Sequence, residues 1–594
     1  MELNRAAEIF VWIASAAVAG ATIHAQQPPA ATANKPAAMV THTASWEGDW
    51  SGTLQVGETG LQLVLHLSND PQGEWHAKLD SLNQAVYGIE ASKVTREEDT
   101  LRLEIASVGA KFQGKIQPDH RTIRGLWEQG GTGLPLKFEK RAAGAASRAA
   151  ANAVSKAEGT WQGAIEVTNM RMRLQMHVAH DDKGRLLASI DNLDQGIQGI
   201  PASKVTEKDG ELSFEIPTFQ AEYRGTLSAS KNELAGDWTQ NDSVEKLDFR
   251  RSDQPLELRR PQNPTKPYPY AAEEVSFPAG DGKATLAGTL TMPQGAGPFA
   301  AVVMIGEGPA DRDATTAGHK PFLVLADLLT RKGLAVLRYD KRGTAQSTGS
   351  SERATMEDLT SDAGAALTYL KARKEVDAKR VGIIGLGEGG ILAAQVAARN
   401  TDLDWLVLLA TPATSGEQTL LRQSELIART GGLPEEQIAR SQQFDRMAYT
   451  AVREEKSASA LEARLNALIE KSGLSASMPP AALQAQIRLM TTPWFRQYLD
   501  FNPVPVLEAI KCPVLALNGD RDLQVDADET VPLLRQAYEK SGNKDFTVLE
   551  IQGVNHLFQK AQSGSPALYG AIEETMAPEV QNAISGWVAQ HSAQ

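Results

Sequence analysis

Two residues near the C-terminus have the types and the order of a catalytic pair. His556 lies in the segment Gly553-Val554-Asn555-His556, directly after an apolar run at 546–551 that predicts the last strand of a sheet. Asp522 follows the preceding apolar run. A histidine that takes up a proton and a carboxylate that orients it are two of the three groups of a serine-type hydrolase. Asp520 is a competing candidate for the carboxylate, although its place nearer the strand end also suits a cap of the turn.

An earlier strand and helix have the form that presents the third group, the nucleophile. In hydrolases whose nucleophile sits on a strand-to-helix turn, the chain order is nucleophile, carboxylate, histidine. The run 381–386 predicts a strand, residues 391–399 predict a helix, and Gly387-Glu388-Gly389-Gly390 joins them. That turn contains no serine, cysteine or threonine, so it supplies no nucleophile.

Two backbone N–H groups are also needed, because they stabilise the oxyanion that forms during acyl transfer. The loop Gly306-Glu307-Gly308-Pro309 follows the apolar run 300–305, and its glycines allow the backbone to approach a substrate. We expect the amide of Glu307 to be one donor. The amide of Glu388, at the N-terminus of the helix after the turn, is the expected second donor.

The region from residue 272 to residue 594 alternates apolar runs with amphipathic segments, which predicts a mostly parallel sheet covered by helices. Strands are expected at 284–292, 300–305, 334–339, 381–386, 405–410, 514–518 and 546–551, and helices at 322–332, 356–373, 391–399 and 578–589. The candidate site residues then lie at the carboxyl ends of strands, where ligands bind in such sheets.

The segment from about 414 to 505 interrupts this alternation, because it has helical periodicity and no strand pattern. It predicts a helical cap over the carboxyl ends of the strands. Trp494 and Phe495, together with Tyr498 and Phe501, either line the substrate pocket or pack the cap onto the core. Neither a cofactor nor a metal ion is expected in this region.

The first part of the chain contains a duplicated segment. Gly48-Asp49-Trp50-Ser51-Gly52 recurs as Gly159-Thr160-Trp161-Gln162-Gly163, and the run 88–95 recurs as 199–206. Each pair lies 111 residues apart (48 against 159, 88 against 199), so no net insertion separates the copies. Alternating apolar residues with glycine, asparagine and aspartate turns predict a small antiparallel barrel or sandwich in each copy.

Neither copy contains a recognisable catalytic group. The tryptophans are expected to fill the barrels rather than to bind a ligand. His66 and His177 occupy equivalent positions, and His66 lies on the side of its strand opposite the leucines, so it is expected to be exposed and not to bind a metal. The copies resemble the β-domains that precede the enzyme domains of many secreted bacterial proteins.

The N-terminal residues have the features of an export signal. Arg5 precedes an apolar run from Ile9 to Ile23, and Ile23-His24-Ala25 provides a cleavage site before Gln26. The run is short for a membrane span. We therefore expect an exported protein, periplasmic or secreted, without a membrane span after cleavage; an uncleaved anchor or a disordered tail is the alternative.

Charge and cysteine content limit the possible partners and cross-links. The net charge is −13, and no basic stripe offsets it, which argues against a nucleic-acid partner. Cys512 is the only cysteine, so no disulfide can form within the chain.

The C-terminal region also contains six longer motifs. In chain order they are Gly308-Pro309-Ala310-Asp311-Arg312-Asp313, His319-Lys320-Pro321-Phe322, Arg338-Tyr339-Asp340-Lys341-Arg342-Gly343, Thr492-Pro493-Trp494-Phe495, Gly519-Asp520-Arg521-Asp522-Leu523-Gln524-Val525 and Asn555-His556-Leu557-Phe558. Together they resemble a family of bacterial secreted α/β-hydrolases, esterases or serine aminopeptidase-like enzymes. The resemblance implies an α/β-hydrolase fold with a helical cap, preceded here by two tandem all-β modules, and a small-molecule ester or a peptide as substrate.

The resemblance also identifies what the chain lacks. The family's turn reads Gly-His-Ser-Glu-Gly-Gly, whereas this chain reads Gly385-Leu386-Gly387-Glu388-Gly389-Gly390. Gly387 thus stands at the nucleophile position, and no acyl-enzyme can form through a glycine. Three nearby serines are not expected to face the histidine and do not replace the missing group: Ser347, Ser350 and Ser361.

Two hypotheses for the function follow. The chain is a serine-hydrolase scaffold for esters or peptides with weak or lost turnover, or it is a non-catalytic binding or scaffolding protein derived from a hydrolase. Gly387 is either a natural replacement or a variant made to trap a ligand, and the accompanying change to Leu386 favours natural variation. Serine at position 387 is expected to restore activity, and histidine at 386 is the second change to make where Leu386 obstructs the pocket.

These features divide the chain into seven segments. The expected bounds are 1–25 for the signal peptide, 26–44 for a disordered spacer, 45–141 for the first β-module, 142–157 for a linker, 158–252 for the second β-module, 253–271 for a proline-rich linker and 272–594 for the hydrolase domain.

The two β-modules should fold without the hydrolase domain, because the repeat is complete and the following linker contains five prolines. A fragment that ends near Asp253 is expected to show β-type circular dichroism and a cooperative unfolding transition. An insoluble or molten fragment would contradict this boundary.

Overall fold

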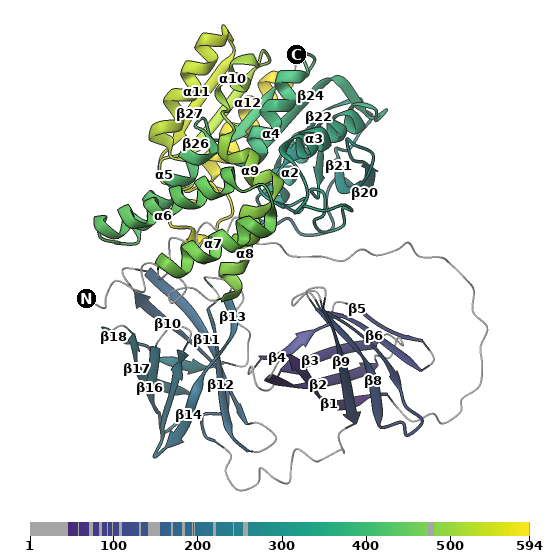
Figure 1. Ribbon diagram of the computed structural model, residues 1–594. Helices are drawn as coiled ribbons and strands as arrows, with labels where there is room; N and C mark the ends of the chain where they lie inside the picture. The colour runs from purple at the N-terminus through teal and green to yellow at the C-terminus, as the bar shows by residue number, and fades with distance from the viewer. Residues whose placement is uncertain are drawn as a thin grey trace, which may run out of the picture. The chain divides into compact units, whose positions relative to one another are not determined.

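The structure is a computed structural model whose described residues form two compact units, one ending at Glu257 and one beginning at Leu258 (Figure 1). It describes residues 46–592 except for 57–58, 70–74, 82–85, 92, 98, 106–109, 130–131, 141–154, 168–169, 181–183, 193, 195–196, 218–220, 241–242, 253–258 and 473–479. The expected export signal and spacer, residues 1–44, lie outside the described residues, as do parts of both linkers.

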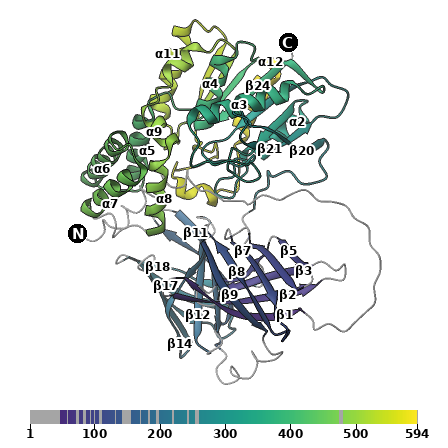
Figure 2. The same ribbon diagram turned by 45° about the vertical axis from the view of Figure 1, so that its right-hand side comes forward.

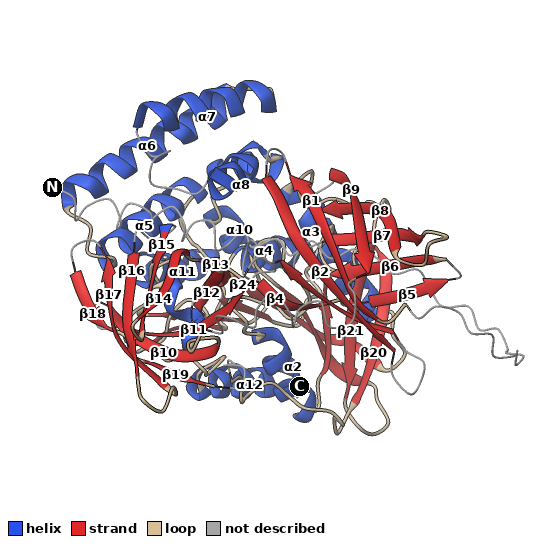
Figure 3. Cartoon of the chain, turned by 90° about the horizontal axis from the view of Figure 1, so that it is seen from below, coloured by secondary structure: helices blue, strands red, loops and turns tan. Residues whose placement is uncertain are grey.

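Each copy of the duplicated segment forms one antiparallel sheet in which neighbouring strands are mostly consecutive (Figure 3). The first sheet has the order β4-β3-β2-β1-β9-β8-β7-β6-β5, and the second has β13-β12-β11-β10-β19-β17-β16-β15-β14, with β18 beside β17. The first nine strands are β1 (Gly48–Val56), β2 (Thr59–Asn69), β3 (Trp75–Ser81), β4 (Val86–Glu90), β5 (Lys93–Glu97), β6 (Thr100–Ile105), β7 (Ala110–Ile116), β8 (Thr122–Gln129) and β9 (Thr132–Lys140). The others are β10 (Gly159–Val167), β11 (Met170–His180), β12 (Leu186–Asn192), β13 (Ile197–Pro201), β14 (Ser203–Lys208), β15 (Glu211–Ile216), β16 (Ala221–Leu227), β17 (Glu233–Gln240), β18 (Ser243–Lys246) and β19 (Phe249–Arg251).

The two sheets repeat each other in their internal contacts. Trp50 and Trp161 are fully buried. Each indole Nε1 donates a hydrogen bond to the carbonyl four residues earlier, at 2.9 Å to Trp46 and 2.8 Å to Ala157. The tryptophans therefore lie in the cores of the barrel-like sheets, as packing residues.

The equivalent histidines lie on the outer side of these sheets. His66 is 39% exposed and is held by two carboxylates, with both ring nitrogens 2.7 Å from oxygens of Asp49 and Asp80. His177 keeps one such contact, at 3.0 Å to Asp191. Among the described residues, no group of three or more histidine, cysteine, aspartate or glutamate side chains is arranged to hold a metal ion.

The C-terminal unit contains an eight-stranded sheet in the order β20-β21-β23-β22-β24-β25-β26-β27, covered by helices (Figure 2). The pairs β20–β21 and β21–β23 at one edge are antiparallel, and the pairs from β23 through β22 to β27 are parallel. The strands are β20 (Ala271–Pro278), β21 (Thr285–Met292), β22 (Phe299–Ile305), β23 (Ala335–Tyr339), β24 (Val376–Leu386), β25 (Leu406–Leu409), β26 (Val514–Gly519) and β27 (Phe546–Ile551).

Two apolar clusters pack the helices onto this sheet, one on each face. One joins the sheet to α3 (Met356–Lys371), α4 (Glu388–Arg399) and α11 (Ala527–Ser541), and the other joins it to α2 (Pro321–Arg331) and α12 (Pro578–Ser592). This two-layered cover leaves the carboxyl ends of the parallel strands free to carry loops.

The helical insertion between β25 and β26 has its own apolar core. Its helices are α5 (Gly416–Thr430), α6 (Glu435–Glu454), α7 (Ala458–Ser472), α8 (Pro480–Thr491), α9 (Pro493–Asp500) and α10 (Val504–Ala509). A short 3₁₀ helix, η6 (Pro566–Ala571), lies outside the insertion, after β27. The described part of the predicted cap at 414–505 therefore consists of helices joined by short connections. None of the described helices is long and apolar enough to cross a membrane.

Strand β20 was not expected, because its residues begin inside the predicted linker 253–271 and carry charges. Residues 271–274 are exposed and include Glu273 and Glu274, whereas only Val275 and Phe277 are buried. Such a composition is compatible with an edge strand, which needs only one covered face.

Replacement of the buried tryptophan of the second module tests its packing role. Trp161→Ala is expected to lower the free energy of unfolding of the β-module fragment by about 3–5 kcal/mol, the usual cost of removing a buried large aromatic side chain. Val244→Ala, at a side chain that is 61% exposed, is the matched control and should change it by less than about 0.5 kcal/mol. Equal effects in denaturant unfolding would place Trp161 outside the core.

Candidate active site

The turn between β24 and α4 has a backbone conformation that suits glycine. Gly387 has φ 54° and ψ −122°, in a region that residues with a side chain rarely adopt. Its N–H donates to the carbonyl of Leu409 at 2.8 Å, and its own carbonyl accepts from Gly390 at 3.0 Å. The turn at position 387 is thus sharp, and a hydrogen bond joins it to the neighbouring strand β25.

Asp522 and His556 lie in contact at the ends of β26 and β27, as the sequence predicts. Nδ1 of His556 is 2.9 Å from Oδ2 of Asp522, and both residues are buried. The other oxygen, Oδ1, accepts hydrogen bonds from the amides of Gln524 and Val525 at 2.8 and 2.9 Å. These amides hold the carboxylate in one orientation, and the carboxylate in turn holds the imidazole.

The competing residue, Asp520, has a different contact. Its Oδ1 accepts a hydrogen bond from the amide of Gly553 at 2.6 Å, at the start of the loop that carries His556. Asp520 therefore caps the histidine loop, and Asp522 is the carboxylate beside the imidazole.

The side chain of Glu307 occupies the space that a serine side chain at position 387 would need. A Cβ atom on Gly387 would lie 2.6 Å from both Cδ and Oε2 of Glu307, which is closer than such atoms approach. Oε2 of Glu307 also lies 2.9 Å from Nε2 of His556. A carboxylate oxygen from the loop after β22 thus lies beside both position 387 and the histidine.

Sequence reasoning predicted only a backbone role for Glu307 and missed this side-chain contact. The available signal was an acidic residue between two glycines, in a chain whose turn carries glycine at position 387. Residue spacing places the backbone of the two loops near each other, but it does not give the side-chain rotamer.

His556 lies between two carboxylates. Its burial lowers the pKa of the imidazole, but the charges of Asp522 and Glu307 and their hydrogen bonds outweigh that effect and raise the pKa to about 10. At neutral pH the ring therefore carries two protons, and each N–H donates to one carboxylate. A cation in this state can release a proton but cannot accept one.

The side chain of Glu388 connects the site to the cap. Its Oε2 accepts hydrogen bonds from the amide of Gly308 at 3.0 Å and from Nζ of Lys341 at 2.8 Å. Its Oε1 accepts from the indole Nε1 of Trp494 at 2.8 Å. One buried carboxylate thus links the loop of Glu307, the segment after strand β23 and helix α9.

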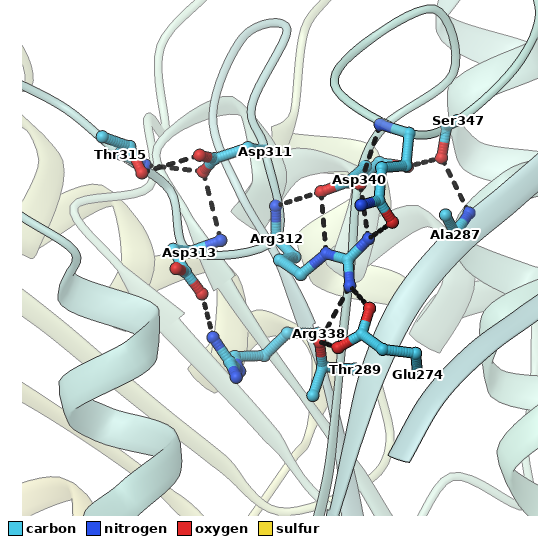
Figure 4. A network of polar contacts seen from close by, with 11 residues as sticks. Glu274, Ala287, Thr289, Asp311, Arg312, Asp313, Thr315, Arg338, Asp340 and Ser347 are labelled. Carbon is cyan, nitrogen blue, oxygen red and sulfur yellow. Dashed lines mark hydrogen bonds and ion pairs between the residues drawn. The ribbon is translucent and has the colours of Figure 1, made fainter. Parts of the chain in front are cut away.

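The segment after the loop 306–309 is anchored by a polar network (Figure 4). The guanidinium of Arg312 donates to both oxygens of Asp340, at 3.1 and 2.8 Å, and to Thr289 at 2.8 Å, and it pairs with Glu274. Asp313 forms an ion pair with Arg338, which lies on strand β23. These contacts fix the C-terminal end of the Glu307 loop to β20, β21 and β23.

Ser347 belongs to the same region but not to the site. Its hydroxyl donates to the carbonyl of Asp340 at 2.6 Å and accepts from the amide of Ala287 at 2.9 Å (Figure 4). Its oxygen is therefore used in holding this loop, consistent with the expectation that it does not replace the nucleophile.

A small cavity of about 60 Å³ lies beside Glu307 and Glu388, under the cap. The cap side chains Trp494, Phe495 and Tyr498 line it, and Trp494 and Tyr498 stack with ring centroids 5.0 Å apart. Phe501 instead packs against the cluster of Met356, Ile391 and Tyr498. The walls are Glu307, Gly308, Glu388, Pro412, Thr419, Leu420, Gln423, Leu489, Trp494, Phe495, Tyr498, Gln524 and Val525.

The expected oxyanion donors lie in elements that suit them. The amide of Glu388 begins α4, where helix geometry leaves N–H groups without an acceptor inside the helix. The loop of Glu307 borders the same cavity.

Comparison with known proteins places the C-terminal unit among hydrolases. Residues 320–560 match the family model described as serine aminopeptidase, S33. Esterase EstD of Thermotoga maritima is 26% identical over 306 residues, which cover 51% of this chain and 66% of that protein. The chain thus spans just under two thirds of that relative's length.

Solved structures of esterases also align with the chain. An esterase of Pyrococcus furiosus aligns with a TM-score of 0.35 and 13% identity, over 57% of this chain and 99% of that chain. Est1E of Butyrivibrio proteoclasticus, solved with ferulic acid, aligns with a TM-score of 0.32 and 15% identity, over 54% and 100%. Neither likeness says anything about activity.

The family match, the order of the strands and the site at their carboxyl ends agree with one another. The C-terminal unit therefore has an α/β-hydrolase fold that follows two all-β modules, and its residues 320–560 are similar to the serine aminopeptidase S33 family.

Proposed function

We propose that the C-terminal unit contains a site for carboxylic esters or peptides, and that this site does not form the usual acyl-enzyme. The similarity to an esterase supports the substrate class. The contact between Asp522 and His556 supports a hydrolase origin of the site. Because Gly387 offers no oxygen, acyl transfer by a Ser-Asp-His triad is lost or weak in this chain.

One observation carries this proposal. The carboxylate of Glu307 lies where a serine hydroxyl would lie, and it makes the hydrogen bond to Nε2 of His556 that the hydroxyl would make. The histidine is therefore paired on both sides and is not free to activate an alcohol.

The cavity indicates which esters fit. Leucine, tryptophan, phenylalanine and tyrosine side chains, with Pro412 and Val525, are seven of its thirteen wall residues, so an apolar acyl or alcohol group is favoured. Glu307 and Glu388 face the same space and repel a negatively charged substrate. Short neutral esters are the substrates to test first.

A non-catalytic binding protein is the second candidate function, and the saturated pairing of His556 favours it. Hydrolysis of p-nitrophenyl acetate by the wild-type chain and by His556→Ala separates the two candidates. Turnover that depends on His556 supports an enzyme. Binding of the ester without turnover supports a binding protein.

We also propose that the protein is exported. This rests on the apolar run from Ile9 to Ile23 and the small residues at its end. Detection of mature chains that begin at Gln26 would test the proposal.

Serine at position 387 is expected to restore less activity by itself, because the carboxylate of Glu307 must first turn away from the new Cβ. Gly387→Ser combined with Glu307→Ala is expected to gain ester hydrolysis by several orders of magnitude, since nucleophile loss in such triads costs on the order of 10⁶ in turnover. Labelling by a fluorophosphonate probe should appear in the double variant and be weak or absent in Gly387→Ser.

Glu307→Ala alone is the control for this pair, since it opens the space without adding a nucleophile. Histidine at position 386 is not expected to help, because Leu386 packs in the apolar cluster under α2 and α12. Full labelling of Gly387→Ser alone would show that Glu307 does not obstruct the serine.

The paired histidine also predicts how stability depends on pH. The pKa of His556 is raised from 6.5 to about 10 in the folded chain, so the folded state holds one more proton than the unfolded state between these values. This contribution to stability is complete below pH 6.5 and is lost as the pH rises towards 10. Glu307→Gln removes one carboxylate and should reduce the effect.

Denaturant unfolding of both proteins from pH 6.5 to pH 10 measures this difference. The stability of the wild type relative to Glu307→Gln should fall with pH, by at most about 1.4 kcal/mol per pH unit. Parallel curves would mean that Glu307 does not influence the protonation of His556.

A further inference from the structure

We propose that Glu307 and His556 act as a general base and a general acid, so that water attacks the ester directly and no acyl-enzyme forms. This inference deepens the proposed function of the site as an ester hydrolase and rests on it. It replaces the missing nucleophile by a water molecule rather than by another side chain.

The position of Glu307 carries the first step. Its carboxylate is 25% exposed and borders the cavity, whereas its partner His556 is 1% exposed. One oxygen is 2.9 Å from Nε2 of His556. A water molecule needs roughly 10–15 Å³ of such space, so a cavity of about 60 Å³ has room for water beside the carboxylate.

The loop holds this carboxylate without help from position 387. Gly308, next to Glu307, donates its amide to Glu388, and Lys341 holds Glu388 from the other side. Arg312 fixes the following segment to Asp340. The carboxylate is therefore presented by an anchored loop and fills a space that only glycine at 387 leaves open.

The state of His556 carries the second step. The ring lies between the carboxylates of Asp522 and Glu307, and the two nitrogens are 2.9 Å from their oxygens. In an ordinary triad a neutral imidazole first takes a proton from the nucleophile. Here the doubly protonated ring can only give a proton, so its available role is that of an acid.

The proposed reaction balances within the site. The water oxygen bonds to the ester carbonyl carbon, its proton passes to the carboxylate of Glu307, and the carbonyl electron pair moves to oxygen. When that oxyanion collapses, the bond to the alcohol oxygen breaks, and this oxygen takes the Nε2 proton of His556. The products are a carboxylic acid and an alcohol. Glu307 then returns its proton to His556 across their hydrogen bond, which restores the starting state.

The backbone supplies the remaining requirement. The amide of Glu388 begins helix α4, so its N–H and the helix dipole favour a negative charge at the mouth of the turn. An oxyanion formed beside position 387 is stabilised there.

Kinetics of the full chain with matched variants test the roles. Glu307→Gln should lower kcat for short neutral esters about 10²–10⁴-fold, the usual contribution of a positioned base. Glu436→Gln, at an exposed glutamate of the cap that is paired with Arg440, is the control and should retain wild-type rates. His556→Gln should slow alkyl acetates at least about tenfold more than p-nitrophenyl acetate, because nitrophenolate leaves without a proton; His591→Gln is its control.

Chemical rescue distinguishes a base from a structural side chain. Glu307→Ala opens the space of the carboxylate, and added sodium formate should restore part of its activity. Glu307→Gln fills that space and should not respond to formate. Absence of rescue in a folded Glu307→Ala variant, together with an unchanged kcat in Glu307→Gln, would overturn the role of Glu307.

The pH profile provides a second readout. Activity should be flat around neutrality and fall as His556 loses its proton in the alkaline range. The groups that face the ring are Asp522 and Glu307, and the phenols of Tyr498 and Tyr569 lie near these carboxylates with their pKa values raised by burial, so they stay neutral. Activity that rises with deprotonation of His556 would contradict an acid role.

Mass spectrometry of acid-quenched turnover mixtures checks the order of bonds. No acetylated protein should accumulate with p-nitrophenyl acetate, and an acetyl group found on Glu307 would replace the proposed base by a nucleophile. If the wild type hydrolyses esters and Glu307→Gln does so equally, the inference fails and the proposed function stands. If the wild type shows no turnover above His556→Ala, the hydrolase function fails as well.

Discussion

The contact between the carboxylate of Glu307 and the imidazole of His556 determines what the C-terminal site can do. It exists because Gly387 has no side chain, so the space beside the turn is open to a group from another loop. With Asp522 on its other side, the histidine becomes a shared cation between two anions. Burial would otherwise oppose that charge. These two contacts stabilise the protonated ring. A protonated ring cannot accept a further proton, so it cannot act as a base.

The surrounding fold positions this contact independently of the chemistry. The turn of Gly387 keeps its conformation through bonds to Leu409 and Gly390, and the loop of Glu307 is held from behind by Glu388 and Arg312. Both loops begin at the carboxyl ends of adjacent strands, β22 and β24. A parallel sheet therefore brings them together whether the turn carries serine or glycine.

Sequence patterns predicted the parts of the structure that depend on periodicity and order. Alternating apolar residues indicated the two β-modules, and the positions of Asp522 and His556 after successive strands placed them in contact. The side chains of Glu307 and Glu388 escaped prediction because their roles depend on rotamers and on buried space, which spacing does not encode. Strand β20 escaped because its charged residues are typical of a loop, and only pairing with β21 makes an edge strand of them.

The fit between Gly387 and Glu307 bears on the origin of the glycine. If serine alone had been removed from an active hydrolase, the loop residue would have been compatible with serine before the change. Glu307 in its present position is not, because its carboxylate lies 2.6 Å from where the serine Cβ would be. Moving it away would separate it from His556 and leave its charge beside a cavity with apolar walls, at a cost in solvation. Glycine at position 387 thus allows the contact between Glu307 and His556, and the accompanying Leu386 favours natural variation of the turn over a single substitution made to trap a ligand.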